Sequence, residues 1–202
     1  IKRIIYMKKL ISKSERFFIA GSRGMVGQAI IKALRISGYG EKEHGGIFLT
    51  PSREELNLLN TEDVEKWFLI NKPTVVVLAA AKVGGIQANN SMPADFILEN
   101  LKIQNNVIEN SWKMNVKRFL FMGSSCIYPK FAKQPIKEEY LLDGQLEKTN
   151  EWYAIAKIAG LKLCNALRNQ HGFDAISLMP TNLYGPGDNY HDTNSHVMAA
   201  LL

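Results

Sequence analysis

Three side chains in the sequence could together do chemistry on a carbonyl group: Tyr153, Lys157 and Ser124. Tyr153 and Lys157 are four positions apart, so in a helix they share one face. A nearby ammonium group stabilises a phenolate, so we expect the pKa of Tyr153 to be lowered. Such a tyrosine can pass a proton to or from a carbonyl oxygen, while Ser124 polarises the same oxygen.

A glycine-rich turn gives this pair its context. It follows a buried apolar run and opens an amphipathic segment, and it consists of Gly21, Ser22, Arg23, Gly24, Met25, Val26 and Gly27. Gly21 permits a tight turn, Gly24 lets the backbone approach a pyrophosphate, and Gly27 allows close packing of helix and strand. The free N–H groups of the helix that follows favour phosphate. The turn therefore predicts a dinucleotide site.

The end of the second predicted strand indicates which dinucleotide. NAD sites usually place an acidic residue there, about 20 residues after the glycines. Here the strand ends in Leu49-Thr50-Pro51-Ser52-Arg53, with no acid before Glu54. Arg23 and Arg53 could face a 2′-phosphate instead. We therefore expect NADP(H), although Arg53 is equally compatible with a solvated loop arginine.

The elements that must position these residues follow from hydrophobic periodicity. Continuous apolar strands alternate with helices, which predicts an α/β fold: a Rossmann-type doubly wound parallel sheet with helices on both faces. The expected strands are Arg16–Ala20, Ile47–Thr50, Thr74–Ala80, Phe119–Ser124 and Ala175–Met179. The expected helices are Met25–Ser37, one capped by Thr61 and running to Asn71, one from Pro93 to near Met114, Glu151–His171, and a last one capped by Ser195 over His196–Leu202.

The Ser-Tyr-Lys set and the G-x-x-G-x-x-G turn resemble the extended branch of the short-chain dehydrogenase/reductase superfamily. Further stretches resemble one of its families, the GDP-L-fucose synthases. The stretches that carry this resemblance are Gly21–Gly27, Ala79–Ile86, Gly123–Lys130, Tyr153–Lys157, Pro180–Pro186 and Asn194–Val197. The Ser-Ser-Cys-Ile-Tyr-Pro and Asn-Ser-His-Val runs are specific to that family, and the match covers nearly all of Phe17–Leu202.

The resemblance implies a two-part reaction on a GDP-sugar. GDP-4-keto-6-deoxy-D-mannose would be epimerised at the two carbons beside its ketone and then reduced by NADPH to GDP-L-fucose. Cys126 and His196 occupy the family positions for proton exchange at these carbons, and a thiol and an imidazole suit that role near neutral pH. Cys126 considered without the family is more often a small buried hydrophobe.

The resemblance also implies which residues hold the cofactor. Besides the glycine turn, Arg53, Tyr153, Lys157 and His196, the expected set contains Met122, Gly123, Ser124, Ser125, Pro180, Thr181, Asn182 and Leu183. One residue departs from the family pattern: Asn60 stands where an aspartate near the adenine is expected, which puts adenine affinity in doubt. Members of the family continue, beyond the position that corresponds to Leu202, into a substrate domain. Full-length members are typically homodimers.

Charge and cysteine content exclude other classes. The net charge is +6, but residues 1–16 hold six basic residues against one acid, so a basic tail over 1–15 precedes the predicted nucleotide-binding domain at 16–202. A nucleic-acid binder would carry its basic patch on the folded body. The sequence has no apolar run long enough to form a membrane-spanning helix. Cys126 and Cys164 lack metal-ligand spacing and indicate a reducing, cytoplasmic setting; Cys164 is expected to be structural.

Two alternatives remain at this stage. Another extended-branch enzyme, such as a UDP-sugar 4-epimerase or a nucleotide-sugar dehydratase, would usually hold NAD and lack the Cys126/His196 pair. A module that binds NADP(H) without catalysis would not need Ser124, Tyr153 and Lys157. Measuring turnover by the purified chain would distinguish an enzyme from such a binding module.

Overall fold

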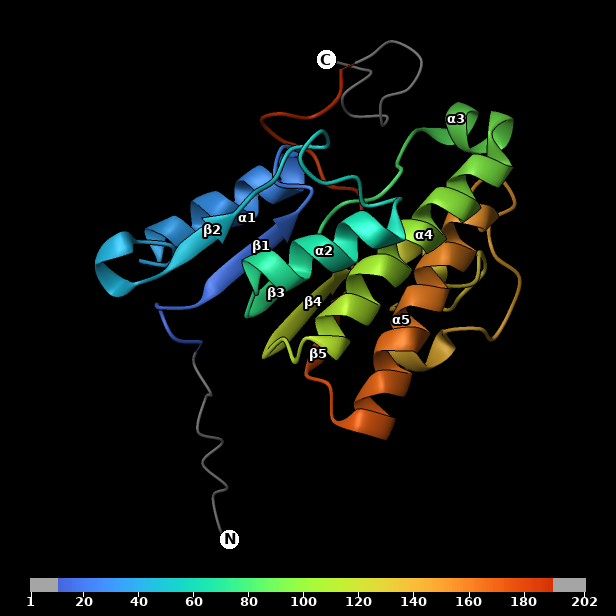
Figure 1. Ribbon diagram of the computed structural model, residues 1–202. Helices are drawn as coiled ribbons and strands as arrows, with labels where there is room; N and C mark the ends of the chain where they lie inside the picture. Colours follow the sequence, from blue (N-terminus) through green and yellow to red (C-terminus); the bar gives the residue numbers. More distant parts are fainter. Residues whose placement is uncertain (1–10, 191–202) are drawn as a thin grey trace, which may run out of the picture.

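The structure is a computed structural model that describes residues 11–190 (Figure 1). In this range, five parallel strands form one sheet in the order β2-β1-β3-β4-β5, which confirms the predicted fold class. The strands are β1 (Arg16–Ala20), β2 (Ile47–Leu49), β3 (Val75–Leu78), β4 (Arg118–Met122) and β5 (Ala175–Leu178). The helices are α1 (Met25–Ile36), α2 (Thr61–Asn71), α3 (Ile86–Ser91), α4 (Pro93–Lys113) and α5 (Glu151–His171), and short 3-10 turns occur at η1 (Lys42–His44), η2 (Ser125–Ile127) and η3 (Glu138–Tyr140).

The central strand shows why the sheet is parallel and covered on both sides. All four residues of β3, Val75–Leu78, are buried. A strand with only β-branched and apolar side chains can be buried on both faces, which helices must then cover. β3 pairs in parallel with β1 on one side and β4 on the other.

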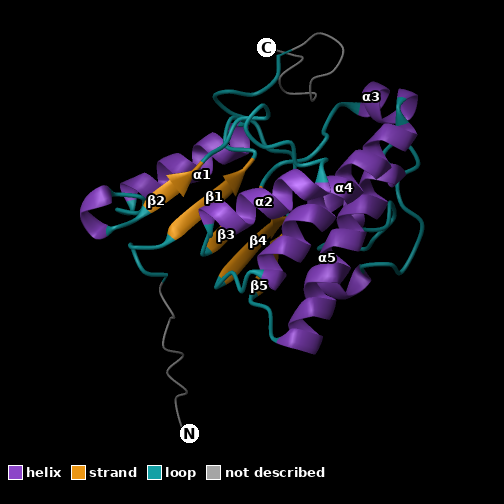
Figure 2. Ribbon diagram, viewed as in Figure 1, coloured by secondary structure: helices purple, strands orange, loops and turns teal. Residues whose placement is uncertain are grey.

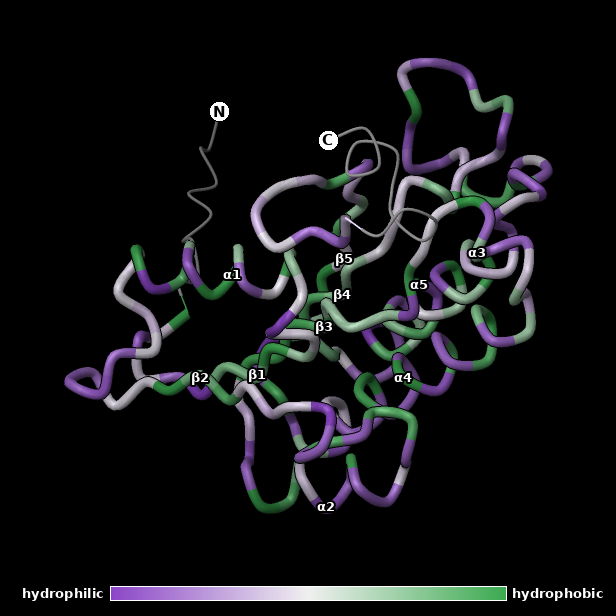
Figure 3. Tube along the Cα trace, turned by 90° about the horizontal axis from the view of Figure 1, so that it is seen from above, coloured by the Kyte–Doolittle hydropathy of each residue, from purple (hydrophilic) through white to green (hydrophobic). Residues whose placement is uncertain are grey.

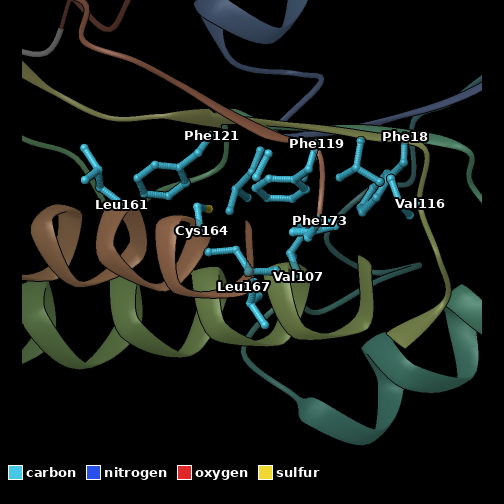
Figure 4. Packing of buried hydrophobic residues seen from close by; sticks show 14 of the residues in the cluster. Phe18, Val107, Val116, Phe119, Phe121, Leu161, Cys164, Leu167 and Phe173 are labelled. Carbon is cyan, nitrogen blue, oxygen red and sulfur yellow. The ribbon is translucent and has the colours of Figure 1, made fainter. Parts of the chain in front are cut away.

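The helices that cover the two faces of the sheet differ (Figure 2). α1 covers one face, and α2, α4 and α5 cover the other, an arrangement also visible from above in Figure 3. The larger core includes Phe119 and Phe121 of β4 packed over Cys164 and Leu161 of α5 (Figure 4). The smaller core places α1 against Phe17, Ile19, Val75 and Val77.

The strand order places a ligand-binding edge between β1 and β3. The chain winds from β1 outward to β2, and then returns to add β3, β4 and β5 on the other side of β1. Ligands of open α/β sheets bind in the crevice at the carboxyl ends of the two strands where the winding reverses. The glycine turn follows β1 directly, so it lies at this edge.

Several sequence expectations need correction. Asn60, not Thr61, caps α2: its side-chain oxygen accepts hydrogen bonds from the backbone N–H groups of Glu62 and Asp63, at 3.0 and 3.2 Å. α3 was not predicted, because six residues are too few to show a helical period. β4 ends at Met122, so Ser124 lies just beyond the strand and caps η2.

Further findings concern the two ends of the chain and the question of membrane-spanning helices. Residues 11–15 belong to the expected basic tail, yet Ile11 packs against the smaller core and Glu15 is buried and pairs with Lys117 at 2.7 Å. The expected final helix lies outside the described residues. Within residues 11–190, we find no helix that combines the length and apolar character needed to span a bilayer.

Candidate active site

The glycine turn has the backbone that a phosphate-binding turn needs. Gly21 adopts φ +86°, and a Cβ there would lie 2.7 Å from the backbone nitrogen of Ala80, so the turn presses against the loop that follows β3. A Cβ on Gly27 would lie within 3 Å of the backbone of Gly21 and Ser22, so α1 can approach the turn only with glycine there. Both predicted roles are therefore seen in the geometry.

Gly24 differs from the other two glycines. It precedes α1, and a Cβ at this position would meet only the carbonyl oxygen of Gly21, at 3.5 Å. No acidic residue occupies the first turn of α1. The free N–H groups of α1 and the positive end of its dipole therefore favour an anion here.

Arg23 and Arg53 lie near the same place, at the end of β2 beside the glycine turn. Both are exposed, and both charges act on the carboxyl group of Glu54. The pKa of Glu54 is lowered mainly by hydrogen bonding to Ser52, with smaller contributions from the two arginines. The two arginines that the sequence singled out are thus near each other, and the exposed carboxylate of Glu54 lies near both.

The loops that follow β4 and β5 run side by side past the strand ends. The backbone N–H of Gly123 donates to the carbonyl of Leu178 at 2.8 Å, and that of Ser125 donates to the carbonyl of Pro180 at 3.0 Å. A Cβ on Gly123 would lie 2.7 Å from the sulfur of Met179, so the two loops need glycine to come this close. The predicted segments Met122–Ser125 and Pro180–Leu183 are therefore neighbours.

An apolar hollow joins these loops to the glycine turn. Its volume is about 360 Å³, and its walls include Met25 and Val26 from the start of α1, Met122 from β4, and Leu183 from the loop after β5. Three segments that were chosen separately from the sequence thus line one space. Ala29, Ile30 and Ala33 of α1 and Leu120 and Leu178 of the sheet line the rest of it, so the hollow extends from the strand ends along the sheet face beside α1.

Lys157 is held in a buried position on α5. Its ammonium group donates to the carbonyl oxygen of Met122 at 2.8 Å and lies 5.7 Å from the centre of the Tyr153 ring. Only 4% of the residue is exposed, and burial lowers the pKa of Lys157 to about 8. The expected neighbourhood of Tyr153 and Lys157 on one helix face is confirmed.

The expected effect on Tyr153 is wrong in direction. Burial raises the pKa of Tyr153 to about 12, the charge of Cys126 acts in the same direction, and a hydrogen bond with Ser124 opposes both. The lysine does not offset this, because its ammonium group is directed at the carbonyl of Met122. Tyr153 is therefore protonated near neutral pH, as a proton donor must be.

Cys126 lies beside the same tyrosine. The oxygen of Ser124 accepts a hydrogen bond from the backbone N–H of Cys126 at 3.3 Å, which positions the thiol at the start of η2. Cys126 is half-buried, whereas Cys164 is 1% exposed in the core, where burial raises its pKa to about 12. The expected structural role of Cys164 is confirmed, and Cys126 is the more accessible thiol.

Residues 17–202 match the model of the NAD dependent epimerase/dehydratase family. The chain belongs to this family. It is 56% identical over 196 residues to GDP-L-fucose synthase 1 of Arabidopsis thaliana and 54% identical over 189 residues to GDP-L-fucose synthase of Escherichia coli K12. These alignments cover 97% and 93% of this chain but 59% and 57% of the relatives.

The chain is also similar to a solved structure. A GDP-D-glycero-L-gluco-heptose synthase from Campylobacter jejuni, determined in the presence of NADPH, superposes with a TM-score of 0.85 at 40% identity. The match covers 95% of this chain and 54% of that one. The resemblance to GDP-L-fucose synthases noted in the motifs is confirmed, and the chain spans less than two thirds of its relatives.

One predicted site residue, His196, lies outside the described residues, so its role stays a prediction. Asn60 borders a second, polar hollow of about 540 Å³ at the start of α2, together with Asn57, Leu59, Thr61 and Glu62. The side-chain oxygen of Asn60 already accepts two backbone hydrogen bonds, whereas an aspartate would offer a second oxygen to an adenine.

The structure adds two residues that the sequence did not single out. Asn100 of α4 is buried and clamps the loop after β3: its amide accepts from the backbone N–H of Lys82 at 2.9 Å and donates to the carbonyl of Lys82 at 3.0 Å. Asn150 precedes α5 and contacts Cys126. Neither contact has a local signal, because each joins segments 18 or more positions apart. No group of three or more potential metal ligands occurs among residues 11–190.

Proposed function

We propose that the full-length protein converts GDP-4-keto-6-deoxy-D-mannose into GDP-L-fucose with NADPH, by epimerisation at two carbons and reduction of the ketone. The observation that carries the proposal is the cluster of Ser124, Cys126, Tyr153 and Lys157 at the carboxyl end of β4, on the same edge of the sheet as the glycine turn. The similarity to relatives named GDP-L-fucose synthase supports the choice of substrate.

The residues fit a dinucleotide. The α1 N-terminus and Gly24 would face the pyrophosphate, the Lys157 ammonium group would bind ribose hydroxyls, and the strand-end segments at Met122 and Leu183 would line the nicotinamide ring. When bound, the reduced cofactor supplies a hydride. We propose NADP(H) rather than NAD, because Arg23 and Arg53 adjoin the end of β2.

Each catalytic side chain has a defined task in this proposal. The Cys126 thiolate removes a proton from a carbon beside the ketone, and His196 returns one from the opposite face. Ser124 donates a hydrogen bond to the ketone oxygen and stabilises the enolate. Tyr153, protonated at neutral pH because its pKa is raised, gives its proton to that oxygen during reduction.

Product analysis tests the proposal. Purified protein that carries its native downstream sequence is incubated with the GDP-4-keto sugar and NADPH, and the product is identified by NMR. GDP-L-fucose is expected. Reduction without epimerisation would remove Cys126 and His196 from the mechanism. Binding of NADPH with no turnover would favour a cofactor-binding module, and faster turnover of a GDP-heptose would redirect the substrate.

We also propose a homodimer for the full-length protein. α4 and α5 lie side by side (Figure 1). Leu98 of α4 and Trp152 and Ile155 of α5 are exposed apolar residues. Light scattering measures the mass, and Leu98→Glu combined with Ile155→Glu is expected to give a monomer. An unchanged mass would place the interface elsewhere. The cytoplasmic location stays a prediction.

A further inference from the structure

Asn150 occupies the position before α5 but does not act as a helix cap. An asparagine here usually accepts a hydrogen bond from a backbone N–H of the first helical turn, which contributes about 1 kcal/mol. The Asn150 side chain makes no such bond. Its NH₂ group instead donates to the Cys126 sulfur at 3.3 Å.

The other half of the same amide supports this reading. The side-chain oxygen of Asn150 is buried and has no hydrogen-bond partner among the described residues. A buried acceptor without a partner costs roughly 1–3 kcal/mol. The chain thus gives up a helix cap and leaves an acceptor unpaired, while it keeps the contact with the thiol. Departures from local rules concentrate at functional sites.

We infer that Asn150 is a positioning residue that holds the Cys126 sulfur and favours its thiolate form for proton exchange. A sulfur anion accepts a hydrogen bond more strongly than a neutral thiol does, so an N–H donor at this distance favours the anion. The contact also keeps the sulfur beside Tyr153, whose hydroxyl serves the same ketone. The inference rests on the proposed function, in which Cys126 takes a proton from carbon.

The proton step balances with these groups. The thiolate accepts the proton of the C–H bond beside the ketone and becomes S–H, and the electron pair of that bond forms the enolate, whose oxygen is stabilised by Ser124. Asn150 neither gains nor loses a proton. Its contribution is the hydrogen bond to sulfur, which is strongest before the transfer.

The pH profile of thiol alkylation tests the inference without substrate. Iodoacetamide reacts with the thiolate, and peptide mass spectrometry separates Cys126 from Cys164, which is buried and serves as an internal control. Asn150→Ala removes the donor. We expect the midpoint of the Cys126 profile to move about one pH unit upward, so that the rate below both midpoints falls by several-fold.

Asn150→Leu separates an electrostatic role from a structural one. It keeps the approximate size of the side chain but has no N–H donor, so the midpoint should rise as in Asn150→Ala. A merely structural role predicts that the leucine variant behaves like wild type. Thr149→Ala, one residue earlier, is the matched control and should leave the profile unchanged.

Some results would overturn the inference. One is a midpoint that is the same in wild type, Asn150→Ala and Asn150→Leu. Another is a downward shift, which would mean that the amide oxygen faces the sulfur and favours the neutral thiol. If Asn150→Ala does not fold, the leucine variant, whose side chain is of similar size, decides.

The proposed function is tested separately by substrate hydrogen exchange in deuterated water with the full-length enzyme. Asn150→Ala should slow exchange several-fold at pH 7, and raising the pH should restore it. If Cys126→Ser exchanges at the wild-type rate while the alkylation profile shifts as expected, the proposed function fails and the contact stands. If Cys126→Ser abolishes exchange but the profile does not shift, only the inference about Asn150 fails.

Discussion

Asn60 and Asn150 both stand directly before a helix, and the structure uses them in opposite ways. Asn60 closes the start of α2, where its oxygen accepts two backbone hydrogen bonds. Asn150 leaves the start of α5 uncapped and contacts the Cys126 sulfur with its NH₂ group. The same residue type at the same local position therefore serves helix stability in one region and a reactive side chain in the other.

The regions around the two residues differ in the same sense. The start of α2 borders an open polar hollow, and the hydrogen bonds of the Asn60 side chain are local. The start of α5 leads into Tyr153 and Lys157, whose pKa values burial moves in opposite directions, to about 12 and about 8. Shifted titrations cluster where chemistry takes place. The difference supports the proposal that chemistry takes place near the start of α5, whereas Asn60 stabilises the start of α2.

The largest expected effect is on the α5 side. Tyr153→Phe removes the proton donor and keeps the ring, so ketone reduction by the full-length enzyme should fall about 10²–10⁴-fold while NADPH binding persists. Steady-state rates and a binding titration measure the two. Tyr140→Phe, in the loop before α5, is the control. Near-normal reduction by Tyr153→Phe would show that another group supplies the proton.

The buried lysine should make stability depend on pH. Burial lowers the pKa of Lys157 from 10.5 to about 8 in the folded protein, so between these values the unfolded chain holds more protons on this lysine. The free energy of unfolding should therefore rise with pH across that window, relative to Lys157→Met, by about 1.4 kcal/mol per pH unit.

Urea denaturation of wild type and variant from pH 7 to pH 10 measures this difference. Below pH 8 the difference should be constant, because both states are then protonated at Lys157. Lys162→Met replaces an exposed lysine on the same helix and is the control. If the difference in the free energy of unfolding between wild type and Lys157→Met stays constant above pH 8, the pKa of Lys157 is not lowered in the folded protein.

The cap on α2 should have a smaller effect. Asn60→Ala removes two backbone hydrogen bonds and should lower the free energy of unfolding by about 1 kcal/mol. Asn150→Ala removes no cap, so its cost should be less than half of that. Chemical denaturation of both variants measures the difference. Equal losses would break the contrast between the two helix starts.

The smallest effect is expected for cofactor choice. Arg53 is exposed, and a contact between an exposed charge and a phosphate contributes up to about 1 kcal/mol. Arg53→Ser should weaken NADPH binding by up to roughly fivefold and leave NADH binding unchanged. Calorimetric titrations with both cofactors measure this. Wild-type protein that binds NADH as tightly as NADPH would contradict the assignment of NADP(H).

Local patterns in the sequence determined the fold class and most of the site. Four apolar residues in β3 require cover on both faces, Gly21 and Gly27 stand where a side chain would clash with neighbouring backbone, and a four-residue spacing on a helix puts Tyr153 beside Lys157. These are short-range consequences of backbone geometry and burial, so a single sequence shows them.

Tertiary packing decided what those residues do. The pKa of Tyr153 was expected to be lowered and is raised, because burial outweighs a lysine whose ammonium group is bound to the Met122 carbonyl. Asn60 rather than Thr61 closes α2, and Asn150 contacts a cysteine 24 positions away. Desolvation and long-range hydrogen bonds depend on which segments meet in space, and no local pattern contains that information.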